Sequence, residues 1–239
     1  MQAPDFAQVS AQALTPRDLV FLFEHFPVPG IDAVEAAQRV IERPSTLDSM
    51  LEADYVFDAI HDRQTLWLEV SPQLFFNVML RHCLPSGPRE SGERQAIHYL
   101  ANLLGLFTHA ERLYRVTRND ADAYQYLVDL VAAASQAGPE RGFLVHSHIG
   151  NFAMFTAGIR AEWVEHRHRY KRRPVTVEYY CKMGCSYYFR ASRHPLASEF
   201  GVQQVFRELA ERFGYYRDGL ANMARTYLGH SQSPAISGV

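Results

Sequence analysis

Apolar side chains recur at helical spacing along most of the chain, and prolines or glycines separate the stripes. The first stripe runs from Leu19 to Phe26, after a Thr15-Pro16 start and before Pro27, as is typical of one face of a helix. The same signals predict helices over 16–26, 32–42, 45–60, 72–83, 93–107, 120–137, 143–170, 176–192 and 201–228. We therefore predict an all-α protein, a single multi-helix globular domain of about eight or nine helices.

Four parts of the chain depart from this pattern. Residues 65–70 include β-favouring types and predict at most a minor extended element. Residues 84–92 contain two prolines and two glycines, which predicts a loop or hinge. Residues 1–14 predict a flexible N-terminal arm and residues 229–239 a disordered tail, because both are short and weakly patterned. The predicted helical domain therefore spans 15–228.

The stretch Phe143–Ile159 is apolar on nearly every side, unlike the one-sided stripes elsewhere. A helix that is apolar all round is buried, so we expect this stretch at the centre of the fold. It carries His148 and Asn151, whose polar groups cost about 1–3 kcal/mol each if they are buried without a partner. The sequence leaves two interpretations: hydrogen-bonded core groups that tie helices together, or groups that a ligand satisfies.

Tyrosines surround a glycine in the predicted helix 176–192. A glycine in mid-helix costs about 1 kcal/mol against alanine, which favours a close helix contact or a cavity wall at that point. Tyrosine offers an apolar ring with a polar tip, suited to a pocket or a subunit interface. Our first hypothesis is a non-catalytic helical module that binds a small, partly apolar ligand or self-associates as a homo-oligomer. Its candidate pocket consists of His148, Asn151, Phe155, Tyr180, Gly184 and Tyr187.

A metal site is an alternative interpretation of the histidines. The protein would then be a metal-dependent helical oxidoreductase of the non-haem iron type. Glu165 and His168 show the Glu-x-x-His spacing that di-iron bundles use twice, but it occurs once here, among arginines that repel a cation. We favour no metal and predict no cofactor, with iron as the alternative. The ligands in that alternative are His146, His148, Glu178 and Glu111.

The segment 165–173 is rich in arginine, lysine and histidine, with one tyrosine among them. Such a segment can bind nucleic acid or an acidic partner. It is also typical of a solvated helix end, where cations complement the helix dipole. The formal net charge of −2 adds no general attraction for polyanions, so nucleic-acid binding ranks third among our hypotheses.

Composition supports a folded protein, because 47% of the residues are hydrophobic and 21% are charged. Three cysteines are too few for a disulfide scaffold, and we expect them to be reduced. The N-terminus lacks the basic and apolar regions of a signal peptide, and no apolar run is long enough for a membrane span. We therefore expect a cytoplasmic protein without membrane association.

Overall fold

The computed structural model describes most of the chain. The described ranges are 3–10, 13–25, 32–40, 43–61, 70–171 and 174–228. Every regular element within them is helical, which confirms the all-α prediction for this part of the chain. The predicted extended element near 65–70 falls outside the described residues except for Val70, and the predicted tail 229–239 lies wholly outside them.

The described residues form 14 α-helices, more than the predicted eight or nine. The first seven are α1 (Pro16–Glu24), α2 (Ala33–Val40), α3 (Pro44–Leu51), α4 (Asp54–His61), α5 (Pro72–Cys83), α6 (Ser91–Phe107) and α7 (Ala110–Tyr114). The others are α8 (Leu127–Gln136), α9 (Pro139–Gly158), α10 (Ala161–Tyr170), α11 (Val177–Ser192), α12 (Pro195–Glu199), α13 (Gln203–Glu211) and α14 (Phe213–Met223). A short π-helical turn, Ala224–Leu228, follows α14.

The prediction undercounts helices mainly because three long apolar stripes each contain a break. The predicted helix 45–60 is divided into α3 and α4, 143–170 into α9 and α10, and 201–228 into α13 and α14. At Arg160 the backbone leaves helical geometry with φ −106° and ψ 19°, and at Arg212 with φ −113° and ψ 32°. Neither of these two breaks contains a proline, and the apolar spacing continues across each of them. The sequence pattern therefore gives no sign that the helix ends there.

Side chains cap several helix starts: Thr15 caps α1, Asp32 caps α2 and Thr176 caps α11. Asp18 and Thr15 form the predicted capping box at the start of α1. The stretch 45–48 also has the pattern of a capping box, but α3 begins at Pro44 without a side-chain cap, and the Asp48 carboxylate accepts a hydrogen bond from Arg81. Asp120 does not begin a helix either, since it pairs with Arg141 and α8 starts only at Leu127. In both cases a distant arginine binds a carboxylate whose position in the sequence is typical of a helix start.

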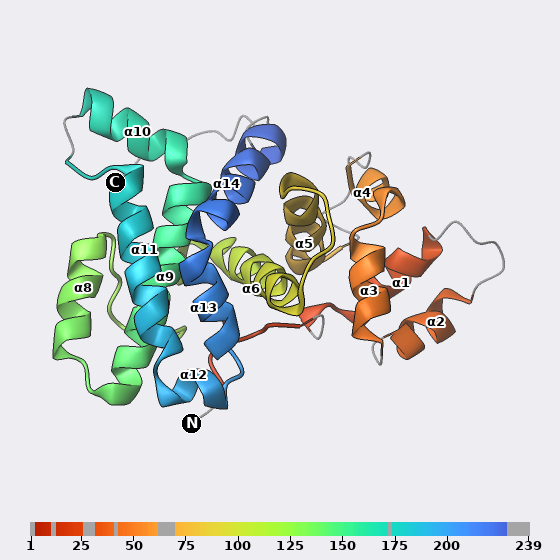
Figure 1. Cartoon of the computed structure of the whole chain (residues 1–239), viewed down its shortest axis with the longest axis horizontal. Helices are drawn as coiled ribbons and strands as arrows, with labels where there is room; N and C mark the ends of the chain where they lie inside the picture. Colours follow the sequence, from red (N-terminus) through yellow and green to blue (C-terminus); the bar gives the residue numbers. More distant parts are fainter. Residues whose placement is uncertain are drawn as a thin grey trace.

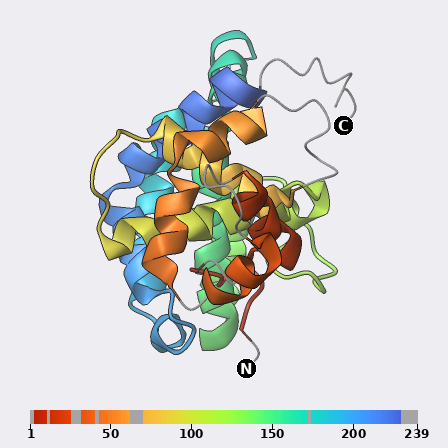
Figure 2. The ribbon, with the colours of Figure 1, turned by 90° about the vertical axis from the view of Figure 1, so that its right-hand side faces the viewer.

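Helix α9 lies inside the largest group of helices, packed against α8, α11 and α14 (Figure 1). Helix α10 continues from its end, and α6 crosses the middle of the molecule next to α5. Helices α1 to α4 form the opposite end of the molecule, beyond α5, and face the viewer in Figure 2. Buried residues along nearly the whole of α9, among them Phe143, Ile149 and Ala157, confirm that the predicted central stretch is buried.

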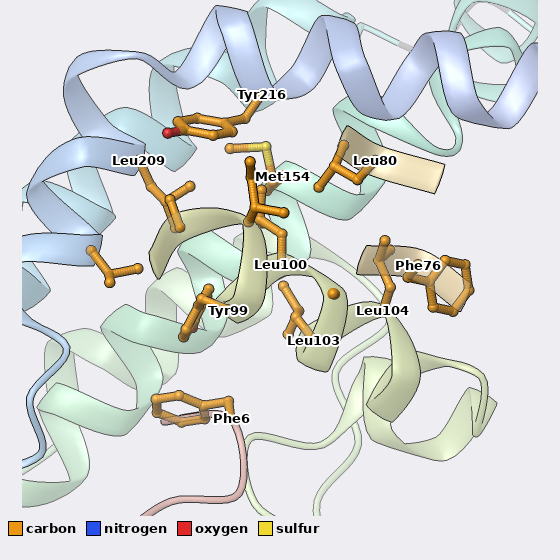
Figure 3. Close-up of a cluster of buried hydrophobic side chains, with 14 of the residues drawn as sticks. Phe6, Phe76, Leu80, Tyr99, Leu100, Leu103, Leu104, Met154, Leu209 and Tyr216 are labelled. Carbon is orange, nitrogen blue, oxygen red and sulfur yellow. The ribbon is translucent and has the colours of Figure 1, made fainter. Parts of the chain in front are cut away.

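The core is continuous from α6 to the helices on both sides of it (Figure 3). In this view Met154 of α9 lies between Tyr216 of α14 and Leu100 of α6, and Tyr99 lies on the other side of Leu100, toward Phe6. Phe6 closes this core from the N-terminal segment, with its ring edge-on to Tyr99 at a centroid distance of 6.4 Å. Phe6, Ala7 and Val9 of the predicted N-terminal arm are packed against the domain, while the flexibility of the arm stays a prediction.

Candidate functional site

Asn151 lies in the core of the protein, where two tyrosines satisfy its side-chain oxygen. The hydroxyls of Tyr99 and Tyr188 donate to Asn151 Oδ1 over 2.7 and 2.8 Å. Both lone pairs of that oxygen are thus used, and all three residues are buried. These contacts join α6, α9 and α11 and support the interpretation of Asn151 as a core residue that ties helices together.

His148 is also in the core, one helical turn before Asn151. Burial lowers the pKa of His148 to about 4, with a further contribution from Arg112, while a hydrogen bond with the Leu113 backbone opposes the shift. The imidazole is therefore neutral at pH 7. Its Nε2 atom has no hydrogen-bond partner among the described residues, and its ring lies edge-on to Phe107. His148 thus supports the end of α7 from inside the protein.

Gly184 marks the closest contact of α11 with its neighbours. A Cβ atom at this position would lie 2.2 Å from Phe213 Cε2 and 3.2 Å from Ala153 Cβ. Gly150 of α9 meets α11 in the same way, since a Cβ there would lie 2.6 Å from Tyr188 Cδ1. Close packing of α9, α11 and α14 therefore accounts for the mid-helix glycine, and aromatic rings fill the space that the pocket hypothesis assigned to a ligand.

We expect Gly184→Ala to lower the free energy of unfolding by about 1–3 kcal/mol, because the new methyl group forces Phe213 to move in a packed core. Urea denaturation measures this change. Gly214→Ala in α14 is the matched control, since a Cβ there meets no atom within 4 Å and should not destabilise the protein. A Gly184→Ala protein as stable as wild type would show that α11 does not pack this closely.

The other predicted pocket residues lie at different places on the helices. Tyr187 is buried against His146, with ring centroids 5.3 Å apart. Phe155 is half-buried, between Phe107 and the guanidinium of Arg160. Tyr180 lines a cleft at the end of α9. Of the six predicted pocket residues, Tyr180 is the one that lines this cleft.

The alternative metal ligands do not come together. Glu178 is exposed and pairs with Lys182, and Glu111 is exposed and pairs with Arg115. His146 packs against Tyr187, away from these carboxylates. Within the described ranges, no three His, Cys, Asp or Glu side chains are grouped so that they could hold a metal ion. All three cysteines are free, and burial raises the pKa of Cys83 to about 11.

The main candidate site is the cleft between α9, α10, the start of α11 and the segment from Tyr114 to Tyr126. Its volume is about 350 Å³. Tyrosines and a tryptophan form much of its rim, and Phe152 and Val164 contribute buried apolar surface. The lining residues are Tyr114, Gln125, Tyr126, Phe152, Thr156, Arg160, Trp163, Val164, Arg167, Pro174, Val175 and Tyr180.

Two arginines give the cleft its charge. The guanidinium carbons of Arg160 and Arg167 lie 5.8 and 4.5 Å from the ring of Trp163, close enough for cation–π interactions. Among the described residues no carboxylate pairs with either arginine, and none lines the cleft. A guanidinium stacked on a ring keeps the N–H groups along its edge free to donate. The cleft therefore combines two anchored cations with an apolar interior.

Local contacts hold the cleft walls in place. Arg160 donates to the hydroxyl of Tyr114 over 3.3 Å, and the Tyr124 backbone N–H donates to the Tyr114 carbonyl over 2.7 Å. Arg141 of α9 holds the same segment through two hydrogen bonds to Asp120, of 3.0 and 2.8 Å. The irregular segment between α7 and α8 thus forms a supported wall of the cleft.

Sequence reasoning missed most of this site. The basic segment 165–173 supplies Arg167, whereas Arg169 and Lys171 are exposed outside the cleft, and residues 172–173 are not among those described. Arg160 and Trp163 were not predicted. Their spacing with Arg167, i, i+3 and i+7, was the available signal, because it places all three on one face of a helix.

Comparisons of the chain with models of protein families, with curated proteins and with solved structures gave no match. None of the helices in the described ranges is both long and apolar enough to cross a membrane. The functional interpretation therefore depends on the geometry of the cleft.

Proposed function

We propose that the protein binds a small anionic molecule with an apolar body in the cleft between α9, α10 and α11. One observation carries this proposal: the guanidinium groups of Arg160 and Arg167 both lie over the ring of Trp163 at the cleft, and no described carboxylate neutralises them. Arginines held in this way suit carboxylate, phosphate or sulfonate groups, which accept two N–H bonds from one guanidinium.

The remaining lining supports an apolar body for the ligand. Phe152 and Val164 present buried hydrocarbon surface, and Val175 and Pro174 add to it. A volume of about 350 Å³ lies at the lower end of the range for small-molecule sites, roughly 300–1,000 Å³. The hydroxyl of Tyr180 is a further polar group of the lining. Burial raises the pKa of this hydroxyl, while the charges of Arg167 and Arg160 oppose that shift.

The fluorescent probe 8-anilinonaphthalene-1-sulfonate tests the proposal, since it joins a sulfonate to an apolar ring system. We expect it to bind wild-type protein, and Arg160→Gln with Arg167→Gln to weaken binding at least about tenfold, because each charged hydrogen bond contributes about 1.5–3 kcal/mol. Trp163 reports the same event, provided that Trp67, the second tryptophan, is replaced by phenylalanine.

The matched control replaces Arg169 and Lys171 by glutamine, which removes the same charge from exposed positions of the same segment. This variant should bind the probe as wild type does. The neutral N-phenyl-1-naphthylamine should bind more weakly than the sulfonate and respond little to either double substitution. Equal loss of sulfonate binding in both double variants would contradict the proposal, because general electrostatic attraction would then explain it.

A further inference from the structure

A second cluster of polar side chains lies between α3, α5 and α6, far from the cleft along the chain. Its centre is Arg81, which is 2% exposed, with His98 beside it at 7%. Arg81 donates to Asp48 Oδ1 and to Glu52 Oε1, each over 2.6 Å. These contacts attach α3 and the residue after it to α5.

The contacts of Arg81 determine how Asn77 is oriented. Arg81 Nε donates to Asn77 Oδ1 over 2.8 Å, so the oxygen of this amide faces the guanidinium. The Asn77 amide nitrogen then faces His98 Nδ1 at 2.8 Å. An amide NH₂ group only donates, so His98 Nδ1 is the acceptor and carries no proton.

The remaining ring nitrogen of His98 therefore carries the proton. His98 Nε2 donates to Asp48 Oδ1 over 2.9 Å, and the same oxygen accepts from Arg81. The opposite tautomer would turn a lone pair toward the Asp48 carboxylate and an N–H toward the Asn77 amide. The contacts with Asn77 and Asp48, at 2.8 and 2.9 Å, thus favour the neutral Nε2–H form of His98 over the longer approach of Arg81 Nη2 to Nε2, at 3.3 Å.

A second proton on His98 has no place in this arrangement. The second proton would bind Nδ1, so that two donors, Nδ1–H and the Asn77 amide NH₂, would face each other. Rotating that amide by half a turn would place its NH₂ group against another donor, Arg81 Nε–H. Charged groups face the ring from each helix packed around it: Asp48 from α3 and Arg81 from α5, with Arg94 of α6 3.4 Å from Asp48. Glu52, directly after the end of α3, pairs with Arg81 and is the last member of the cluster.

We propose that the protonation state of His98 controls the packing of α3: neutral His98 holds α3 against α5 and α6, and protonation of His98 releases α3. The proposal is independent of ligand binding in the cleft. Burial lowers the pKa of His98 and Arg81 lowers it further, while Asp48 opposes the shift. Because the pKa of His98 in the folded protein lies below the ordinary value of 6.5, the attachment of α3 is complete above pH 6.5 and weakens as the pH falls below that value.

Amide hydrogen exchange of α3 tests this, after correction for the pH dependence of intrinsic exchange. We expect the protection of α3 relative to α9 to fall by up to about tenfold for each pH unit below about 6.5, since one proton is taken up on opening. In His98→Gln, the amide can still donate to Asp48 but cannot be protonated, so relative protection should be the same at pH 7.5 and 5.5. His61→Gln on α4 should retain the pH dependence.

Unchanged relative protection in wild type overturns the proposal, as does a pH dependence that persists in His98→Gln. If His98→Gln does not fold, the ring ¹⁵N signals of wild-type His98 decide instead. We expect a protonated Nε2, an unprotonated Nδ1 and a titration that coincides with the opening of α3. A protonated Nδ1 at pH 7.5 overturns the proposal.

Discussion

Replacement of Asn151 by leucine is expected to lower the free energy of unfolding by about 2–5 kcal/mol. Leucine has nearly the shape of asparagine but accepts no hydrogen bond, so the buried hydroxyls of Tyr99 and Tyr188 lose their partner. Each unsatisfied buried group costs about 1–3 kcal/mol. Urea denaturation measures the loss of free energy, provided that the slope of that free energy against urea concentration (the m-value) is unchanged.

The control removes the hydroxyls as well. In a triple variant with Asn151→Leu, Tyr99→Phe and Tyr188→Phe, no polar group of this set is left unpaired, so stability should recover in large part. Asn151→Leu within about 1 kcal/mol of wild type, or a triple variant less stable than the single one, would mean that Asn151 does not join the three helices.

Arg81→Met is expected to destabilise the protein by about 3–5 kcal/mol, the usual cost of removing one member of a buried ion pair. The substitution removes the closest cation of Asp48, leaving Arg94 at 3.4 Å, and leaves Asn77 Oδ1 without its donor. Arg39→Met is the matched control, because Arg39 forms an exposed pair with Glu35 and should contribute nothing measurable.

Acid should reduce the difference between Arg81→Met and wild type. Burial alone would raise the pKa of Asp48, but the hydrogen bond from His98 and the charge of Arg81 bring it below its ordinary value of 3.8. The stabilisation is therefore present above that pH and is lost as the pH falls through the folded pKa. A full effect of Arg81→Met at pH 2.5 would contradict this assignment, as would no effect at pH 7.

Local patterns in the sequence predicted the helices and the buried position of α9, because helical spacing and capping act within a few residues. They could not identify the partners of Asn151, since Tyr99 and Tyr188 are 52 and 37 residues away. Asp48 and Asp120 show the same limit. Both carboxylates have the sequence context of helix caps, yet distant arginines bind them. A bidentate or buried ion pair contributes more stabilisation than a helix cap, which is worth about 1 kcal/mol.

The cleft was harder to predict, since its lining mixes buried residues with exposed ones and comes from separate segments. Basic residues after Glu165 suggested a solvated helix end, and α10 does expose Arg169 there. Arg167 contributes to the cleft because its guanidinium lies over the ring of Trp163. Arg160 contributes because the chain turns there from α9 into α10. That turn is one of the helix breaks that the apolar spacing hides.

Arginine side-chain NMR tests the central claim most directly. On addition of 8-anilinonaphthalene-1-sulfonate, the Nε–H signals of Arg160 and Arg167 and the indole N–H of Trp163 should shift together, with one dissociation constant. The signal of Arg169, exposed on the same helix, should stay in place. Shifts confined to other residues, such as those around the exposed Phe189, would show that the arginine cleft is not the binding site.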